Sequence, residues 1–388
     1  MAARAIHCVR KMKRRRCSSS PLGSFTIHTD CARVRIARIG GGVRRVFVKG
    51  AWFLVASKSG LRHAAYADVA RVGLPQALLY YRYGTLWTTF FQALGREVVV
   101  TRPTDRAIVE RGDALSNDEC CLASKIYMGH VEQLVGACDA VFVPSMANVG
   151  LYRTFCTKFQ SLPDLVVNTF ADRRLRVASC LVNEKQGFDM DESFRALAQD
   201  FGASKKEAKR AWKEAARAQE RVEKEAAEAQ ARAVVVLDEA RKDGGAAPMA
   251  ILLAAHPYVA HDPYLGGSIV DMLRGMGAEV LFADEHDRRR GIKASEGFSE
   301  TMPWVVNREL VGAIELLSAH VDGIVLVSAF PCGPDSMTDD AVVRCLRSTP
   351  ILNLTIDAQS GTAGLETRIE SFVDILSYQR KGGYVHVS

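Results

Sequence analysis

Residues 72–102 read VGLPQALLYYRYGTLWTTFFQALGREVVVTR and combine a strand pattern with a helix pattern. A short apolar strand stops at Pro75, and a helix follows with apolar side chains at helical spacing, such as Leu86 and Phe90. Gly95 is typical of the residue that ends a helix, and the β-branched run REVVVTR after it is typical of a strand. The stretch therefore predicts a β-α-β unit.

A second stretch repeats this order. Residues 250–285 read AILLAAHPYVAHDPYLGGSIVDMLRGMGAEVLFADE. An apolar strand again stops at a proline, Pro257, and the helix that follows ends at Gly277. The strand AEVLFAD then occupies the place that REVVVTR holds in the first stretch. The two stretches therefore predict the same local structure.

The repeat continues further along the chain. Residues 130–145, HVEQLVGACDAVFVPS, and 313–330, AIELLSAHVDGIVLVSAF, each predict a helix, an aspartate and an apolar strand. Two matched segments in the same order favour two related α/β halves with mostly parallel sheets. We place the first half at 71–185 and the second at 248–388.

A helical connector, 186–247, joins the predicted halves. Within it, residues 204–245 read SKKEAKRAWKEAARAQERVEKEAAEAQARAVVVLDEARKDGG, without Gly or Pro before Gly244. The abundance of Ala, Glu, Lys and Arg predicts one long charged helix. Such a helix is usually a solvated packing arm, so we assign no chemistry to it.

The positive charge of the chain is concentrated at one end. Residues 1–70 hold 15 Lys and Arg against two acids, whereas the other 318 residues hold 36 bases against 42 acids. The mildly acidic body does not favour nucleic-acid binding, which needs a basic folded face. We expect residues 1–70 to be an irregular extension; a targeting peptide or a tail for nucleic acid or anionic lipid remains an alternative.

The ten cysteines are irregularly spaced and include no C-x-x-C pair. This spacing is typical neither of a disulfide scaffold nor of a zinc ribbon, and it favours a reducing compartment, the cytoplasm. No apolar run is long enough to span a bilayer, so we expect no membrane association.

Three cysteines fall where an α/β sheet places its ligands, at strand ends and helix starts. Cys156 follows the strand AVFVPS, and Cys332 lies in PCGPDS after the strand GIVLVSAF. Cys121, in NDECCLASK, opens a predicted helix, whose dipole would lower the pKa of its thiol. Together the three cysteines indicate a metal or nucleophile site.

These residues also resemble a known family. The likeness to the 2-hydroxyacyl-CoA dehydratase-like superfamily, and within it to DUF2229-type proteins related to acyl-CoA dehydratase activases, covers about residues 70–378. It is carried by the segments GLPQALLYYRYGTLWTTFFQALG, NDECCLASKIYMGHV, CTKFQSLPD, HPYVAHDPY, PCGPDS and LTIDAQSGTAGLETRIESFVD. The resemblance implies two Rossmann-like halves with a [4Fe–4S] cluster between them, held by Cys121, Cys156 and Cys332, with one iron open to another ligand. The resemblance assigns no ligand role to Cys120.

The resemblance implies a reaction as well. In the family, an ATP-dependent activator (activase) injects one low-potential electron, which the cluster passes to an acyl-CoA thioester or to a partner subunit. A second dehydratase-like subunit is an expected partner. The chain departs from the family pattern in CLAS after Cys121 and in Thr157 after Cys156, changes that remove no ligand. No G-x-x-x-x-G-K-[ST] loop is present, so a separate activator would have to supply ATP.

Other polar residues suit a site at these strand ends: His256, Lys125, His130, Asp335, Ser336 and Asp357. Each has a structural alternative, such as a histidine bonded to backbone or an aspartate that caps a helix. Two other functions stay open. The protein could be a non-catalytic scaffold or maturation partner, or a thiol enzyme with Cys121 as its nucleophile.

Overall fold

The computed structural model describes residues 65–242, 247–358 and 362–382, together with four strands between Phe25 and Ala56. The chain forms two compact units, Met1–Ala65 and Tyr66–Ser388. The second unit contains both predicted halves and the connector. The internal boundaries expected at residues 70, 185 and 247 stay predictions.

The first unit contains an antiparallel sheet of order β1-β2-β3-β4. This sheet differs from the irregular structure that we expected for residues 1–70. Val, Ile, Phe and Trp recur among the basic residues of these segments, which are separated by short connections, and this pattern favours a meander. The expectation for residues 1–24 lies outside the described residues. The strands are Phe25–Thr29 (β1), Ala32–Ile39 (β2), Val43–Val48 (β3) and Ala51–Ala56 (β4).

The first half of the second unit is built on a parallel sheet of order β6-β5-β7-β9. The segment that was predicted as a β-α-β unit forms β5, α2 and β6, which confirms the prediction. A separate parallel pair, β8 and β10, lies beyond β7 in the chain. The strands are Arg71–Leu74 (β5), Glu97–Val100 (β6), Ala140–Phe142 (β7), Ser145–Asn148 (β8), Val177–Ala178 (β9) and Leu181–Asn183 (β10).

The second half has a parallel sheet of order β12-β11-β13-β14. The strands of each sheet can be numbered one to four by their order along the chain. In both sheets their order across the sheet is then second, first, third, fourth. This shared order confirms the predicted α/β architecture of two Rossmann-like halves. The strands are Met249–Ala255 (β11), Ala278–Phe282 (β12), Gly323–Ala329 (β13) and Ile351–Ile356 (β14).

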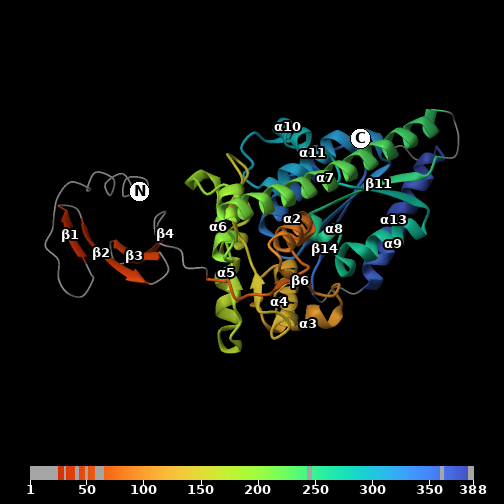
Figure 1. Cartoon of the computed structure of the whole chain (residues 1–388). Helices are drawn as coiled ribbons and strands as arrows, with labels where there is room; N and C mark the ends of the chain where they lie inside the picture. Colours follow the sequence, from red (N-terminus) through yellow and green to blue (C-terminus); the bar gives the residue numbers. More distant parts are fainter. Residues whose placement is uncertain are drawn as a thin grey trace. The chain divides into compact units, whose positions relative to one another are not determined.

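Helices cover the sheets (Figure 1). In the first half they are α2 (Tyr80–Ala93), α3 (Arg106–Ala114), α4 (Leu122–Leu134), α5 (Thr157–Thr169) and the 3-10 turns η2 (Ala171–Arg173) and η3 (Glu184–Gln186). In the second half they are α8 (Pro257–Ala260), the π-helical turn η4 (Pro263–Gly267), α9 (Ser268–Gly275), α10 (Arg288–Phe298), α11 (Val305–Leu317), η5 (Ser318–His320), α12 (Gly333–Cys345) and α13 (Thr362–Arg380).

The repeated aspartates have the same structural role in both halves. The carboxylate of Asp139, before β7, accepts a 2.7 Å hydrogen bond from the amide of Arg71 at the start of β5. The carboxylate of Asp322, before β13, accepts a 2.7 Å bond from the amide of Ala250 in β11. Each aspartate thus fixes its strand beside the central strand of its sheet.

The connector contains α6 (Met190–Asp200) and the long helix α7 (Lys205–Lys242), which confirms the predicted charged helix. A capping box starts α7, because the amide of Ser204 donates to Glu207 and the amide of Glu207 donates to the Ser204 hydroxyl. Figure 1 shows α7 in green, passing α2 and running on along the second half. Gln219 bonds to α2 through Arg82 and Leu86, and Gln230 bonds to Phe282 in β12.

The two halves share one apolar core. Aromatic rings pack edge to face within it, such as Phe91 against Phe142 at a centroid distance of 5.0 Å. Buried residues of both sheets and of α2, α4 and α9 belong to this core. Among the described residues, no helix combines the length and the apolar character needed to cross a membrane.

Candidate functional site

Each of the three candidate cysteines is the residue directly before a helix. Cys121 precedes α4, Cys156 precedes α5 and Cys332 precedes α12. The first amides of a helix lack partners within the helix and carry partial positive charge. Each cysteine therefore lies at a position that favours a negatively charged group.

The same three cysteines line one pocket. Cys121 and Cys156 belong to the first half, and Cys332 belongs to the second. The pocket encloses about 50 Å³, more than a single water molecule requires. Cys120, the neighbour of Cys121, is buried and is not among the residues that line it.

The pocket wall is largely apolar. Phe159, Tyr258 and Trp304 contribute rings to it, and Lys158 contributes a cation. Leu78, also in the wall, has a φ of +50°, the left-handed region that a branched side chain rarely occupies. Such a backbone conformation is held by its surroundings and is commonly found at functional sites.

Burial dominates the acid–base chemistry of two of these thiols, Cys121 and Cys332. It raises the pKa of Cys121, against the opposing effect of the Lys158 cation. Burial also raises the pKa of Cys332, and the charge of Asp335 raises it further. Our expectation of a lowered pKa for Cys121 is therefore wrong, because desolvation outweighs the Lys158 charge and the backbone hydrogen bond at Ser124. Buried neutral thiols of this kind are poor nucleophiles, whereas a bound metal would take them as thiolates.

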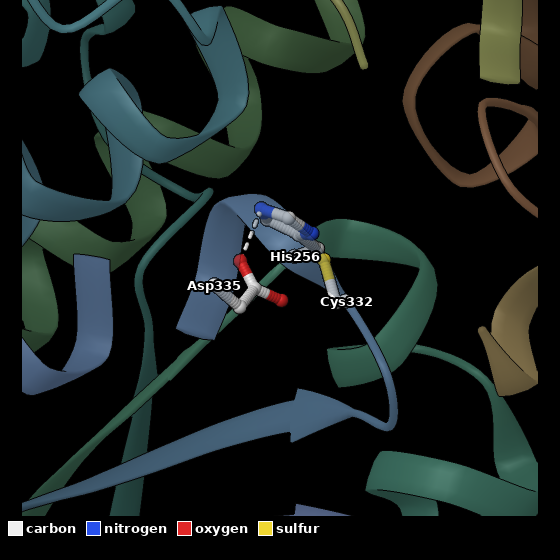
Figure 2. Close-up of side chains that lie close together, drawn as sticks. All are labelled: His256, Cys332 and Asp335. Carbon is white, nitrogen blue, oxygen red and sulfur yellow. Dashed lines mark ion pairs between the residues drawn. The ribbon is translucent and has the colours of Figure 1, made fainter. Parts of the chain in front are cut away.

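Behind Cys332 lies a chain of buried polar side chains. His256, directly before α8, places Nε2 at 3.0 Å from a carboxylate oxygen of Asp335. The hydroxyl of Tyr258 lies 2.6 Å from Nδ1 of His256. The side-chain amide of Asn307 donates to Asp335 at 2.8 Å. Figure 2 shows the His256 ring with Asp335 on one side and the Cys332 thiol on the other.

The charges of His256 and Asp335 stabilise each other. Burial by itself lowers the pKa of His256, but the Asp335 carboxylate beside it outweighs burial and raises the pKa. Burial raises the pKa of Asp335, yet the charge and hydrogen bond of His256, with bonds from Cys332 and Asn307, lower it overall. The two side chains thus form a buried ion pair next to Cys332.

Two sets of potential metal ligands can be compared with the ligand spacing of a single metal ion. Among the described residues, the ligand atoms of His256, Cys332 and Asp335 all lie within 4.8 Å of one another, close enough for one ion. The sulfurs of Cys121, Cys156 and Cys332 do not form such a group. Thiolates on one tetrahedral ion are about 3.8 Å apart, given metal–sulfur bonds of about 2.3 Å. The three thiols therefore do not meet the spacing of a single-ion site.

Other residues that the sequence indicated lie elsewhere. Lys125 is not among the residues that line the pocket and pairs with Asp113 at 2.6 Å. His130 is fully buried between the hydroxyls of Thr101 and Thr104. Ser336 bonds to the carbonyl oxygen of Cys332 at 2.8 Å, outside the three-cysteine pocket.

No sequence pattern indicated Trp304 and Asn307, which come from the segment before and within α11. They reach the pocket only through tertiary packing. Tyr258, two residues after His256, lies in the short helix α8 that follows β11. Its position in the pocket wall could have been inferred from the rule that ligands bind at carboxyl ends of parallel strands.

The sequence matches the profile of a family described as CoA enzyme activase uncharacterised domain (DUF2229) over residues 71–285. That range is more than half of the chain. The chain is a member of the DUF2229 family. In this DUF2229 protein, the matched range contains Cys121, Cys156 and His256, and Cys332 lies beyond its end. A search of curated proteins gives no match to the sequence.

Proposed function

We propose that this DUF2229 protein binds a [4Fe–4S] cluster through Cys121, Cys156 and Cys332 and uses it for low-potential electron transfer. The observation that carries the proposal is the convergence of three cysteines, from three helix starts and from both halves, on one pocket. The electron would go to an acyl-CoA thioester or to a partner subunit.

The donor set suits such a group in three respects. Thiolates are the usual ligands of iron–sulfur clusters. The three sulfurs do not all lie within 4.8 Å of one another, as the ligands of a single ion would. Three helix N-termini and the Lys158 ammonium face a group that would carry negative charge.

When bound, the cluster would supply a one-electron carrier with one iron open to a further ligand. The residues around it have separate roles. Phe159, Tyr258 and Trp304 exclude water, which strengthens electrostatic interactions inside the pocket. The His256–Asp335 pair holds the loop of Cys332 from behind, as partners of metal ligands commonly do.

The expected partner is an ATP-dependent activator, because the family description refers to CoA enzyme activase and the sequence has no phosphate-binding loop of its own. A second dehydratase-like subunit is a further proposed partner. We expect this chemistry in the cytoplasm, since cluster thiolates require a reducing compartment.

Reduction by the activator tests this function. The cluster-loaded protein is mixed anaerobically with dithionite, ATP and the activator of a 2-hydroxyacyl-CoA dehydratase. The electron paramagnetic resonance spectrum is then recorded. We expect a reduced-cluster signal that depends on ATP and is absent from Cys332→Ala. A loaded cluster that is never reduced would instead support the scaffold or maturation role.

A second candidate is a single divalent ion on His256, Cys332 and Asp335, whose ligand atoms lie close enough together. Metal content of two variants separates the candidates. A single ion would be lost from Asp335→Asn and retained by Cys156→Ala, whereas a three-cysteine cluster would be lost from Cys156→Ala.

A further inference from the structure

One buried serine in the wall of the three-cysteine pocket has an unpartnered hydroxyl. Ser124 lies in the first turn of α4, three residues after Cys121, and is only 2% exposed. Its hydroxyl oxygen has no hydrogen-bond partner among the described residues. Leaving a buried polar group unpaired costs free energy. Native proteins therefore keep few such groups, and a redox role or a bound ion is among the reasons for keeping one.

The other hydroxyls that line this pocket have partners. The hydroxyl of Tyr258 lies 2.6 Å from Nδ1 of His256. The hydroxyl of Thr154 accepts a hydrogen bond from the ammonium group of Lys185 at 3.4 Å. Ser124 thus differs from both of the other hydroxyl-bearing residues in the described wall.

A serine inside a helix often satisfies its hydroxyl on a carbonyl oxygen one turn back. Ser295 in α10 does so, because its hydroxyl donates to the carbonyl oxygen of Ile292 at 2.7 Å. Ser124 makes no such bond. Its hydroxyl is therefore available to a group that enters the pocket from outside the chain.

The position of Ser124 beside Cys121 indicates the chemistry of that group. The backbone of Ser124 already contributes a hydrogen bond to the Cys121 thiol, so the residue lies next to one of the three candidate ligand sulfurs. The proposed cluster would bring further sulfurs into this largely apolar pocket, and these carry negative charge. Sulfur accepts hydrogen bonds, and such bonds are one determinant of the reduction potential of a cluster.

We propose that the Ser124 hydroxyl donates a hydrogen bond to a sulfur of the bound cluster and thereby raises its reduction potential. Reduction adds negative charge to the cluster, and a hydrogen bond to a charged acceptor is stronger than one to a neutral acceptor. The donor therefore stabilises the reduced form more than the oxidised form. The inference rests on the proposed function, because the acceptor is the cluster itself.

Anaerobic redox titration of the reconstituted full-length protein, followed by electron paramagnetic resonance, tests the proposal. We expect Ser124→Ala to keep the iron content of the wild type and to have a more negative midpoint potential. At the wild-type midpoint, the ratio of reduced to oxidised cluster should fall at least threefold. The matched control is Ser295→Ala, which removes a buried hydroxyl outside the pocket and should leave the midpoint unchanged.

Thermal unfolding of the cluster-free proteins supplies a second readout. Ser124→Ala should be at least as stable as the wild type, because it removes a hydroxyl that no described residue satisfies. Ser295→Ala should be less stable than the wild type, because it loses the hydrogen bond to Ile292.

Two results would overturn the inference alone. One is a loaded cluster whose midpoint potential is the same in Ser124→Ala and in the wild type. The other is a cluster-free Ser124→Ala protein that is clearly less stable than the wild type, since the hydroxyl would then have a partner in the empty pocket. A wild-type protein that takes up no iron and sulfide would overturn the proposed function and this inference together.

Discussion

The amide of Leu122, the first residue of α4, donates a 2.8 Å hydrogen bond to the carbonyl oxygen of Phe330, two residues before Cys332. This bond joins the helix start that carries Cys121 to the loop that carries Cys332. Because both groups belong to the backbone, the contact does not depend on either side chain. Two candidate ligands from opposite halves are thus held next to each other by the fold.

A buried ion pair also connects the halves. Arg82 in α2 bonds through both terminal nitrogens to the carboxylate of Glu309 in α11, and both side chains are 6% exposed. We predict that Glu309→Gln lowers the free energy of unfolding by about 3–5 kcal/mol, because it leaves the buried arginine without a counter-charge. Denaturant unfolding of the purified variant measures this loss.

The matched control is Glu110→Gln, which removes the same charge from the exposed pair with Arg106. We expect a change below about 1 kcal/mol there. Arg82→Met combined with Glu309→Leu removes both buried charges and should recover much of the lost stability. Equal effects of Glu309→Gln and Glu110→Gln would contradict the assigned role of the buried pair.

Close packing of α3 against α4 depends on glycine. A Cβ atom at Gly129 would meet the carbonyl oxygen of Ile108 well inside contact distance. We predict that Gly129→Ala destabilises the protein by about 1–3 kcal/mol, because α3 and α4 must separate. Gly297→Ala in α10, where a Cβ would meet no atom, should be neutral or stabilising. Thermal unfolding compares the two variants, and a Gly129→Ala protein as stable as Gly297→Ala would refute the packing argument.

Acid should destabilise the protein through His130. Burial, assisted by the Arg102 charge, lowers the pKa of His130 to about 4 in the folded protein, against about 6.5 when unfolded. A histidine buried in its neutral form stabilises the fold fully above the unfolded pKa. That contribution, roughly 3 kcal/mol, is lost as the pH falls from about 6.5 towards 4.

The His130→Gln variant isolates the contribution of His130 to the pH dependence of the unfolding free energy. Between pH 6.5 and 4.5 its unfolding free energy should fall less steeply than that of the wild type, because one fewer proton is taken up on unfolding. Urea unfolding at several pH values measures both slopes. Parallel slopes for the two proteins would show that His130 does not titrate on unfolding.

Much of the fold could be predicted from the repeated order of elements. The glycines that follow α2 and α9, Gly95 and Gly277, both have positive φ, near +71° and +82°. The aspartates before β7 and β13 form the same hydrogen bond in each half. These are local signals, set by backbone conformation and by the start of a strand, so a single sequence can reveal them.

The candidate site could be predicted less completely. The strand-end rule and the family resemblance together indicated the three cysteines, which line one pocket. Periodicity could not show that Lys125 turns toward Asp113 or that Asn307 reaches Asp335 from α11. The pKa of Cys121 was misjudged because burial depends on tertiary packing, whereas the helix start is visible in the sequence.

Iron and sulfide content after anaerobic reconstitution tests the central claim most directly. Our account predicts about four irons per chain, lost from Cys121→Ala, Cys156→Ala and Cys332→Ala and retained by Cys120→Ala. A colourless, iron-free wild-type protein, or a cluster that survives the loss of any one of the three cysteines, would contradict it.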